Sequence, residues 1–108
     1  MIIREWRARA DSANAEAYPA HFRTVVLPEL RHIDGFLGAA LARRRLDERI
    51  EFLVLTRWQS LEAIRGFAGA SIAKAVVEPG AVAALTDFDT HVQHYEVLEE
   101  AAAPIDSR

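Results

Sequence analysis

The chain has 108 residues, a length that fits one domain and excludes a large multidomain enzyme. Hydrophobic residues make up 51% and charged residues 27%, enough apolar material for a packed core. The net charge of −3 provides no general attraction to nucleic acid or to anionic lipid. The sequence contains no cysteine, which excludes thiol catalysis, disulfides, iron–sulfur clusters and cysteine-ligated zinc. Charges recur through the first ten residues, unlike a signal peptide or a membrane span, so we expect a cytoplasmic protein without a membrane partner.

The first third of the chain predicts a strand followed by a helix. Ile2–Ala10 mixes apolar and charged residues in near alternation, which is typical of a strand with one buried face. From Asn14 to Ile33 the apolar side chains recur at three- and four-residue steps, the pattern of an amphipathic helix. Pro28 lacks a backbone N–H, so it should bend or break this helix near residues 24–27, and Asp34-Gly35 should end it.

A β-hairpin and a second helix are predicted next. Phe36–Leu46 and Arg49–Trp58 are rich in β-forming residues and are separated by the two-residue turn Asp47-Glu48. Ser60 offers an N-cap oxygen for a helix that should end near Ala68.

The remaining residues predict a further helical piece over Ile72–Val77, and Pro79-Gly80 should separate it from a short turn at Ala81–Leu85. A last strand is expected over Phe88–Glu99, followed by a frayed tail from Glu100 to Arg108.

The resulting order, β-α-β-β-α-β, predicts an α+β ferredoxin-like fold, with a four-stranded antiparallel sheet covered by helices on one face. We expect residues 1–99 to form one domain and residues 100–108 to form its tail.

The third predicted strand carries apolar residues on both faces. Ile50, Phe52 and Val54 alternate with Leu53 and Leu55, whereas a sheet with one wet face should alternate apolar with polar residues. A chain this short has helices for only one face, so the other face needs a different cover. We therefore expect a two-fold homodimer in which the uncovered sheet faces pack together.

The histidines do not predict a metal site. His91 and His94 are three apart on a predicted strand and leave opposite faces, while His21 and His32 are eleven apart, about 16 Å along a helix. No metal ligand set is therefore assigned.

A nucleic-acid interface is not predicted either. Arg43-Arg44-Arg45 is the one basic run, and Asp47, Glu48 and Glu51 dilute it. The sequence also lacks the spaced surface aromatics on which bases would stack.

The last predicted strand is the most polar part of the chain. Alternation places His94 on one face of it, and His91 and Tyr95 on the other. Either face could belong to a site, or His94 could be a satisfied core or interface histidine and Tyr95 a packed ring. Trp6 and Trp58 leave the same choice between core and pocket.

Three stretches resemble the antibiotic biosynthesis monooxygenase family of small dimeric α+β barrel proteins: Leu30–Gly38 (LRHIDGFLG), Trp58–Gly69 (WQSLEAIRGFAG) and His94–Leu98 (HYEVL). The resemblance extends from Ile2 to Leu98 and implies the ferredoxin-like fold and the dimer.

If chemistry is retained, the resemblance implies oxygenation of a bulky conjugated substrate without metal, flavin or haem. An electron-rich phenolate or enolate can reduce O2 itself, so the protein need only bind it in a dry pocket, take its proton and stabilise the anion. His94 is then the expected base or anion partner, with Tyr95 or His91 as the substitute. The expected substrate-binding side chains are aromatic: Trp58, Phe67, Phe22 and Trp6.

A related group that degrades haem is similar in fold but requires an Asn on the first strand, and a Trp and a His on the second helical segment. Here the only asparagine, Asn14, lies beyond the first predicted strand, and Ser60–Val77 contains neither Trp nor His. The sequence therefore disfavours haem degradation.

Three functions remain open at this stage. The first is a cofactor-independent monooxygenase acting on a polyketide- or quinol-like molecule. The second is a non-catalytic homodimer that binds or senses a small hydrophobic ligand. The third is a dimer whose interior is filled by its own side chains and which acts through a protein partner.

Overall fold

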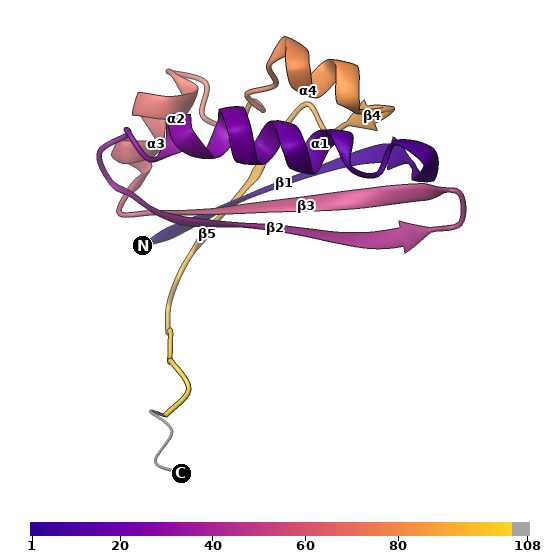
Figure 1. The fold of residues 1–108 in the computed structure, drawn as a ribbon. Helices are drawn as coiled ribbons and strands as arrows, with labels where there is room; N and C mark the ends of the chain where they lie inside the picture. The colour runs from indigo at the N-terminus through magenta and orange to yellow at the C-terminus, as the bar shows by residue number, and fades with distance from the viewer. Residues whose placement is uncertain (105–108) are drawn as a thin grey trace.

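Helices pack on one face of an antiparallel sheet in the computed structural model, which describes residues 1–104 (Figure 1). Residues 105–108, part of the predicted tail, lie outside the described residues. The strands are β1 (Ile2–Asp11), β2 (Phe36–Leu46), β3 (Arg49–Trp58), β4 (Asp87–Phe88) and β5 (Gln93–Glu96). Their spatial order is β2-β3-β1, with β4 and β5 both pairing with β1. This arrangement confirms the predicted α+β, ferredoxin-like fold.

Helical structure runs without a break from Ala17 to Leu30. It consists of α1 (Ala17–His21), the wide π-turn η2 (Phe22–Val26) and α2 (Leu27–Leu30), and a 3-10 turn η1 (Ser12–Asn14) precedes it. The predicted start at Asn14 was therefore wrong. Pro28 cannot donate a backbone hydrogen bond, and the chain widens before it instead of breaking: the N–H of Leu27 bonds the carbonyl of Phe22.

The second helix, α3 (Leu61–Ala68), begins and ends as predicted. The Ser60 hydroxyl accepts a hydrogen bond of 3.2 Å from the N–H of Ala63, and Gly69 ends the helix with a φ of 78°.

The helical prediction for residues 72–77 was wrong. Residues 72–73 form a turn, and the backbone after it bonds partners outside the segment instead of forming a helix: Ala75 N–H bonds the carbonyl of Thr90 at 2.9 Å, and Val92 N–H bonds that of Ala73 at 2.8 Å. The turn expected at residues 81–85 is instead part of α4 (Pro79–Ala84), since Pro79 is well suited to the first turn of a helix. We call residues 69–78, which lie between α3 and α4, the covering segment.

The last strand was predicted as one element over Phe88–Glu99, and this was also wrong. It is divided into β4 and β5 because residues 89–92 between them bond the covering segment. Beyond Glu96 the chain leaves the sheet and runs away on the side opposite the helices (Figure 1).

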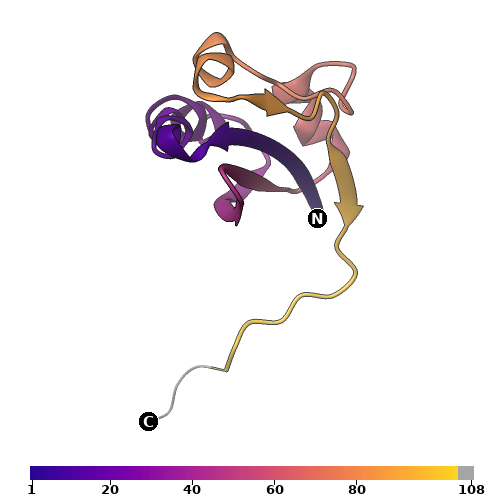
Figure 2. The same ribbon diagram turned by 90° about the vertical axis from the view of Figure 1, so that its right-hand side faces the viewer.

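The two sheet faces differ in burial. The even-numbered side chains from Arg4 to Ala10 on β1, and from Ile50 to Trp58 on β3, are buried beneath the helices. Helix α4 and the α1–α2 segment lie together on that side of β1 (Figure 2). The odd-numbered side chains of β1 and β3 form the opposite side of the sheet, which we call the outer face. None of the helices in residues 1–104 has the length and apolar composition that a membrane crossing requires.

Candidate functional site

A cavity lies between the sheet and the helices. Its volume is about 50 Å³, which is room for a few water molecules. Its polar lining consists of Arg4, Tyr18, His21, Thr56 and Glu78, and its apolar lining consists of Trp6, Val26, Leu30, Val54, Phe67, Val76, Ala81 and Val92. A ligand of several rings must displace part of this wall. We expect residues 76–78 of the covering segment to move, since they contain no helix or strand and lie beyond the Ile72 and Lys74 carbonyls, which Arg4 contacts.

Arg4 brings a buried positive charge to the cavity. It stands on the buried face of β1, and its side chain has no ion pair with a carboxylate in residues 1–104. Its guanidinium donates to the carbonyls of Ile72 (2.5 Å) and Lys74 (2.9 Å), and Nη1 lies 3.0 Å from His94 Nε2. Burial lowers the pKa of Arg4 to about 10, which leaves it charged at neutral pH. The part of the cavity beside Arg4 therefore favours an anionic group.

His21 carries an unpaired polar atom at the same cavity. Its Nε2 is buried and has no hydrogen-bond partner among the described residues. Such an atom costs about 1–3 kcal/mol of stability, so its presence calls for an explanation beyond folding. The ring packs against Gly80 on one side and lies 6.0 Å from the Tyr18 ring. His21 is thus held in place with a nitrogen left available to a ligand.

Two further titratable groups line the cavity with shifted pKa values. Burial, and secondarily the charge of Glu78, raises the pKa of Tyr18, so Tyr18 remains a neutral phenol at physiological pH. A hydrogen bond with Glu29, followed by burial and by the Glu29 charge, raises the pKa of Glu78. Tyr18 can therefore donate a hydrogen bond into the cavity.

The four aromatic residues predicted to bind substrate occupy two layers. Trp6 and Phe67 line the cavity, and the Trp6 indole is fixed by a 2.7 Å hydrogen bond to the carbonyl of Asp89. Trp58 lies behind Phe67, with stacked rings 5.8 Å apart, and Phe22 packs 6.4 Å from Tyr18.

The three residues predicted to be catalytic lie outside the cavity lining. His94 does not line the cavity itself, but it contacts Arg4, which does. Tyr95 pairs with Ile3 on the outer face and is half exposed. His91 is exposed, with its Nδ1 3.0 Å from the Thr90 hydroxyl.

Sequence reasoning missed the polar cavity residues. Arg4 shares its strand face with Trp6 and Ala8, so a charged residue at a buried alternate position was a signal that could have been used. His21 follows Tyr18 by one helical turn on an apolar stripe, which gave a second signal. No group of three or more His, Asp or Glu in residues 1–104 is arranged to hold a metal ion.

The fold and cavity define a small α+β domain with a partly open, aromatic-walled site that carries a buried cation. The sequence model of the antibiotic biosynthesis monooxygenase family matches residues 1–79. The chain belongs to this family. The matched range includes Arg4, Tyr18, His21 and Phe67. A comparison with curated proteins found no match.

Solved structures share the fold. A Deinococcus radiodurans protein assigned to the antibiotic biosynthesis monooxygenases is 21% identical, with a TM-score of 0.62 over 98% of this chain and 100% of that one. A Bacillus cereus protein with the same assignment is 18% identical, with a TM-score of 0.61 over 94% of this chain and 97% of that one. A mutant of MhuD with two manganese protoporphyrin IX molecules bound per active site is 19% identical, with a TM-score of 0.61 over 95% of this chain and 100% of that one. At these identities the likeness shows the fold alone.

Proposed function

We propose that this protein is a cofactor-independent monooxygenase that oxidises a conjugated aromatic molecule, of polyketide or quinol type, with O2. The observation that carries the proposal concerns two groups in one aromatic-walled cavity. Among the described residues, the buried cation Arg4 has no carboxylate partner and the buried nitrogen His21 Nε2 has no hydrogen-bond partner. Membership of the monooxygenase family supports it.

The chemistry assigns one task to each polar group. His21 Nε2 takes a proton from the substrate, and the positive charge of Arg4 stabilises the enolate or phenolate that forms. Tyr18 donates a hydrogen bond to the same anion. Trp6 and Phe67 stack on the conjugated rings and exclude water.

The reaction balances without an added reductant. The substrate anion forms a C–O bond to O2, and the proton held by His21 passes to the distal oxygen. The O–O bond then breaks as the same carbon loses its second hydrogen, so one oxygen atom becomes a carbonyl and the other leaves as water. The reacting carbon, which carries two hydrogens in anthrone and in the keto tautomer of a quinol, supplies all four electrons.

His94 enters the proposal as a positioning residue. Its Nε2 accepts from Arg4, so a neutral His94 holds the guanidinium at the cavity without competing for its charge. The catalytic roles of Tyr95 and His91 remain predictions from the sequence.

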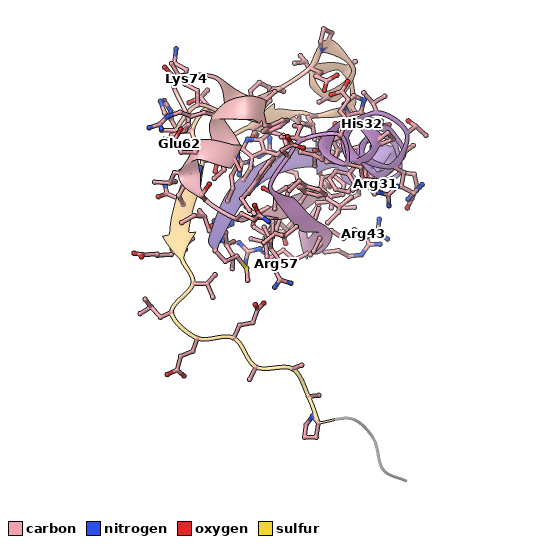
Figure 3. The ribbon with its side chains drawn as sticks, turned by 90° about the vertical axis from the view of Figure 1, so that its left-hand side faces the viewer. Arg31, His32, Arg43, Arg57, Glu62 and Lys74 are labelled. Atoms are coloured by element: carbon pink, nitrogen blue, oxygen red, sulfur yellow. The ribbon has the colours of Figure 1, made fainter. Side chains whose placement is uncertain are left out.

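Oxygen uptake tests the proposal. Purified protein is assayed with anthrone and with 1,4-dihydroxynaphthalene, and we expect uptake above the uncatalysed rate that falls about a hundredfold in His21→Gln. His32→Gln is the matched control, since His32 lies exposed just beyond α2 (Figure 3). Uptake at the uncatalysed rate, or an unchanged rate in His21→Gln, would refute it.

We also propose that two copies pair through their outer faces. Leu53 and Leu55 are half-buried there, and the register of β2 places the exposed Ala40 and Ala42 beside them. Arginines on this face are neutralised within the chain, as in the Arg9–Glu51 ion pair. Leu98, 88% exposed, stands on the chain segment that leaves the sheet on this side. A second copy would cover these apolar groups.

The alternative function is a non-catalytic homodimer that binds or senses a small hydrophobic ligand. One observation favours it: Arg4 joins the cavity to the covering segment through Ile72 and Lys74, so a bound ligand would alter a surface segment. Ligand binding without any oxygen uptake would support this alternative over the enzyme.

A further inference from the structure

The hydrogen bonds of Arg4 leave part of its guanidinium without a protein partner. A guanidinium has five N–H donors, and Arg4 uses three of them, on Ile72, Lys74 and His94. The Nε–H and one Nη2 hydrogen remain without a hydrogen-bond partner within residues 1–104. Arg4 Nε has no hydrogen-bond partner among the described residues, and Arg4 lines the cavity.

Arg4 also differs from the other arginines of β1 and β3 in its lack of an ion pair within residues 1–104. The four other arginines of β1 and β3 each form an ion pair with a carboxylate: Arg7, Arg9, Arg49 and Arg57. Arg4 is the most buried of the five, at 4% exposure, and has no such pair within residues 1–104. A buried charge normally has a counter-charge, so the missing acid points to one supplied by a ligand.

We infer that the ligand of this cavity is an aromatic acid, whose carboxylate is held by Nε and Nη2 of Arg4. These two donors lie on one edge of the guanidinium, and this edge matches the two oxygens of a carboxylate. This inference rests on the proposed function for the cavity and names the class of its substrate.

The surroundings of Arg4 favour a ring attached to that carboxylate. The Arg4 guanidinium carbon lies 5.7 Å from the centroid of the Phe67 ring, and Trp6 lines the same cavity. A flat conjugated acid therefore places its carboxylate on the cation and its ring against aromatic walls. The carboxylate then orients the ring relative to His21, while the enolate or phenolate oxygen takes its hydrogen bond from Tyr18 and feels the Arg4 charge only through space.

Calorimetric titration of the full chain with 2-naphthoate and with 2-naphthamide tests the inference, because the two probes have nearly the same shape and differ in charge. We expect the acid to bind about tenfold or more tightly than the amide. Arg4→Gln should abolish this preference. Arg4→Lys should retain only part of it, because a lysine keeps the charge but lacks the two-donor edge. Arg31→Gln, which removes an exposed arginine (Figure 3), should keep the full ratio.

Equal affinities for acid and amide in the wild-type protein would overturn the inference, as would binding of neither probe. Oxygen uptake with neutral substrates is measured separately, so the proposed function can stand when the inference fails. Circular dichroism establishes that each variant is folded. If Arg4→Gln does not fold, the wild-type comparison still decides the question.

Discussion

The imidazole of His21 packs so closely against Gly80 that a Cβ built at Gly80 would lie 2.8 Å from Nδ1. The ring therefore occupies space that only a glycine at this position of α4 leaves open. This contact fixes the orientation of the nitrogen to which we assign proton transfer.

Gly80→Ala should displace the His21 ring and reduce oxygen uptake about tenfold or more, since catalysis depends on the placement of the base. Stability should fall by at most about 2 kcal/mol, because alanine favours the helix by about 1 kcal/mol while the steric conflict costs about 1–3 kcal/mol. Gly66→Ala is the control: it adds a methyl group in α3 at an ordinary distance of 3.6 Å from Ile33. Wild-type uptake by Gly80→Ala would contradict the assigned role of His21.

Gly35→Ala should destabilise the fold by about 2–4 kcal/mol. Gly35 has a φ of +87°, and a Cβ there would lie 2.5 Å from the Cβ of Ala63, so the substitution is both strained and crowded. Urea denaturation measures the loss, again against Gly66→Ala. A change below about 0.5 kcal/mol would show that this close approach of the loop after α2 to helix α3 does not matter for stability.

The sequence predicted those elements whose pattern is local. β1, the hairpin and α3 follow from alternation, turn residues and the Ser60 cap, and the structure has them. The covering segment and the division of the last strand were not predictable, since both depend on hydrogen bonds between residues 73–75 and residues 90–92. Such pairings are set by tertiary structure and leave no periodic signal.

The sequence indicated two of the aromatic residues that line the cavity, but it did not indicate the polar residues. Large aromatic residues in a small chain suggested Trp6 and Phe67, and both line the cavity. His21 was considered only as a metal ligand, because the sequence does not show that its Nε2 is buried without a partner among the described residues, nor that Gly80, far away in sequence, packs against its ring. No local pattern showed that Arg4 is buried without a carboxylate partner within residues 1–104.

Lowering the pH should destabilise the protein through His94. Burial, and then the charge of Arg4, lowers the pKa of His94 below its ordinary value of 6.5. The unfolded chain then binds the proton more readily, so the contribution of neutral His94 is complete above the ordinary pKa and is lost as the pH falls toward the lowered one. Urea denaturation between about pH 8 and about pH 5.5 should show this decline, and His94→Gln should flatten it. His32→Gln should keep the wild-type slope, and an equal slope in His94→Gln would contradict the prediction.

Leu55→Glu should convert the proposed dimer to a monomer. Leu55 pairs with Glu5 on β1 and Ala40 on β2, in the middle of the outer face, so a charge there would be buried at the interface. Light scattering at micromolar concentration should give twice the chain mass of 12.1 kDa for the wild type and the single mass for the variant. Leu61→Glu, at an exposed leucine of α3, should remain dimeric. A monomeric wild type would refute the pairing.

The central claim is that this cavity lets a conjugated substrate react with O2 without a cofactor or an added reductant. Anthrone oxidised under ¹⁸O2 with a chelator present tests it most directly, through the rate at which labelled anthraquinone forms. We expect faster formation than in protein-free buffer, with one labelled oxygen per anthraquinone and one O2 consumed per product. Formation at the protein-free rate, or acceleration that the chelator removes, would contradict it.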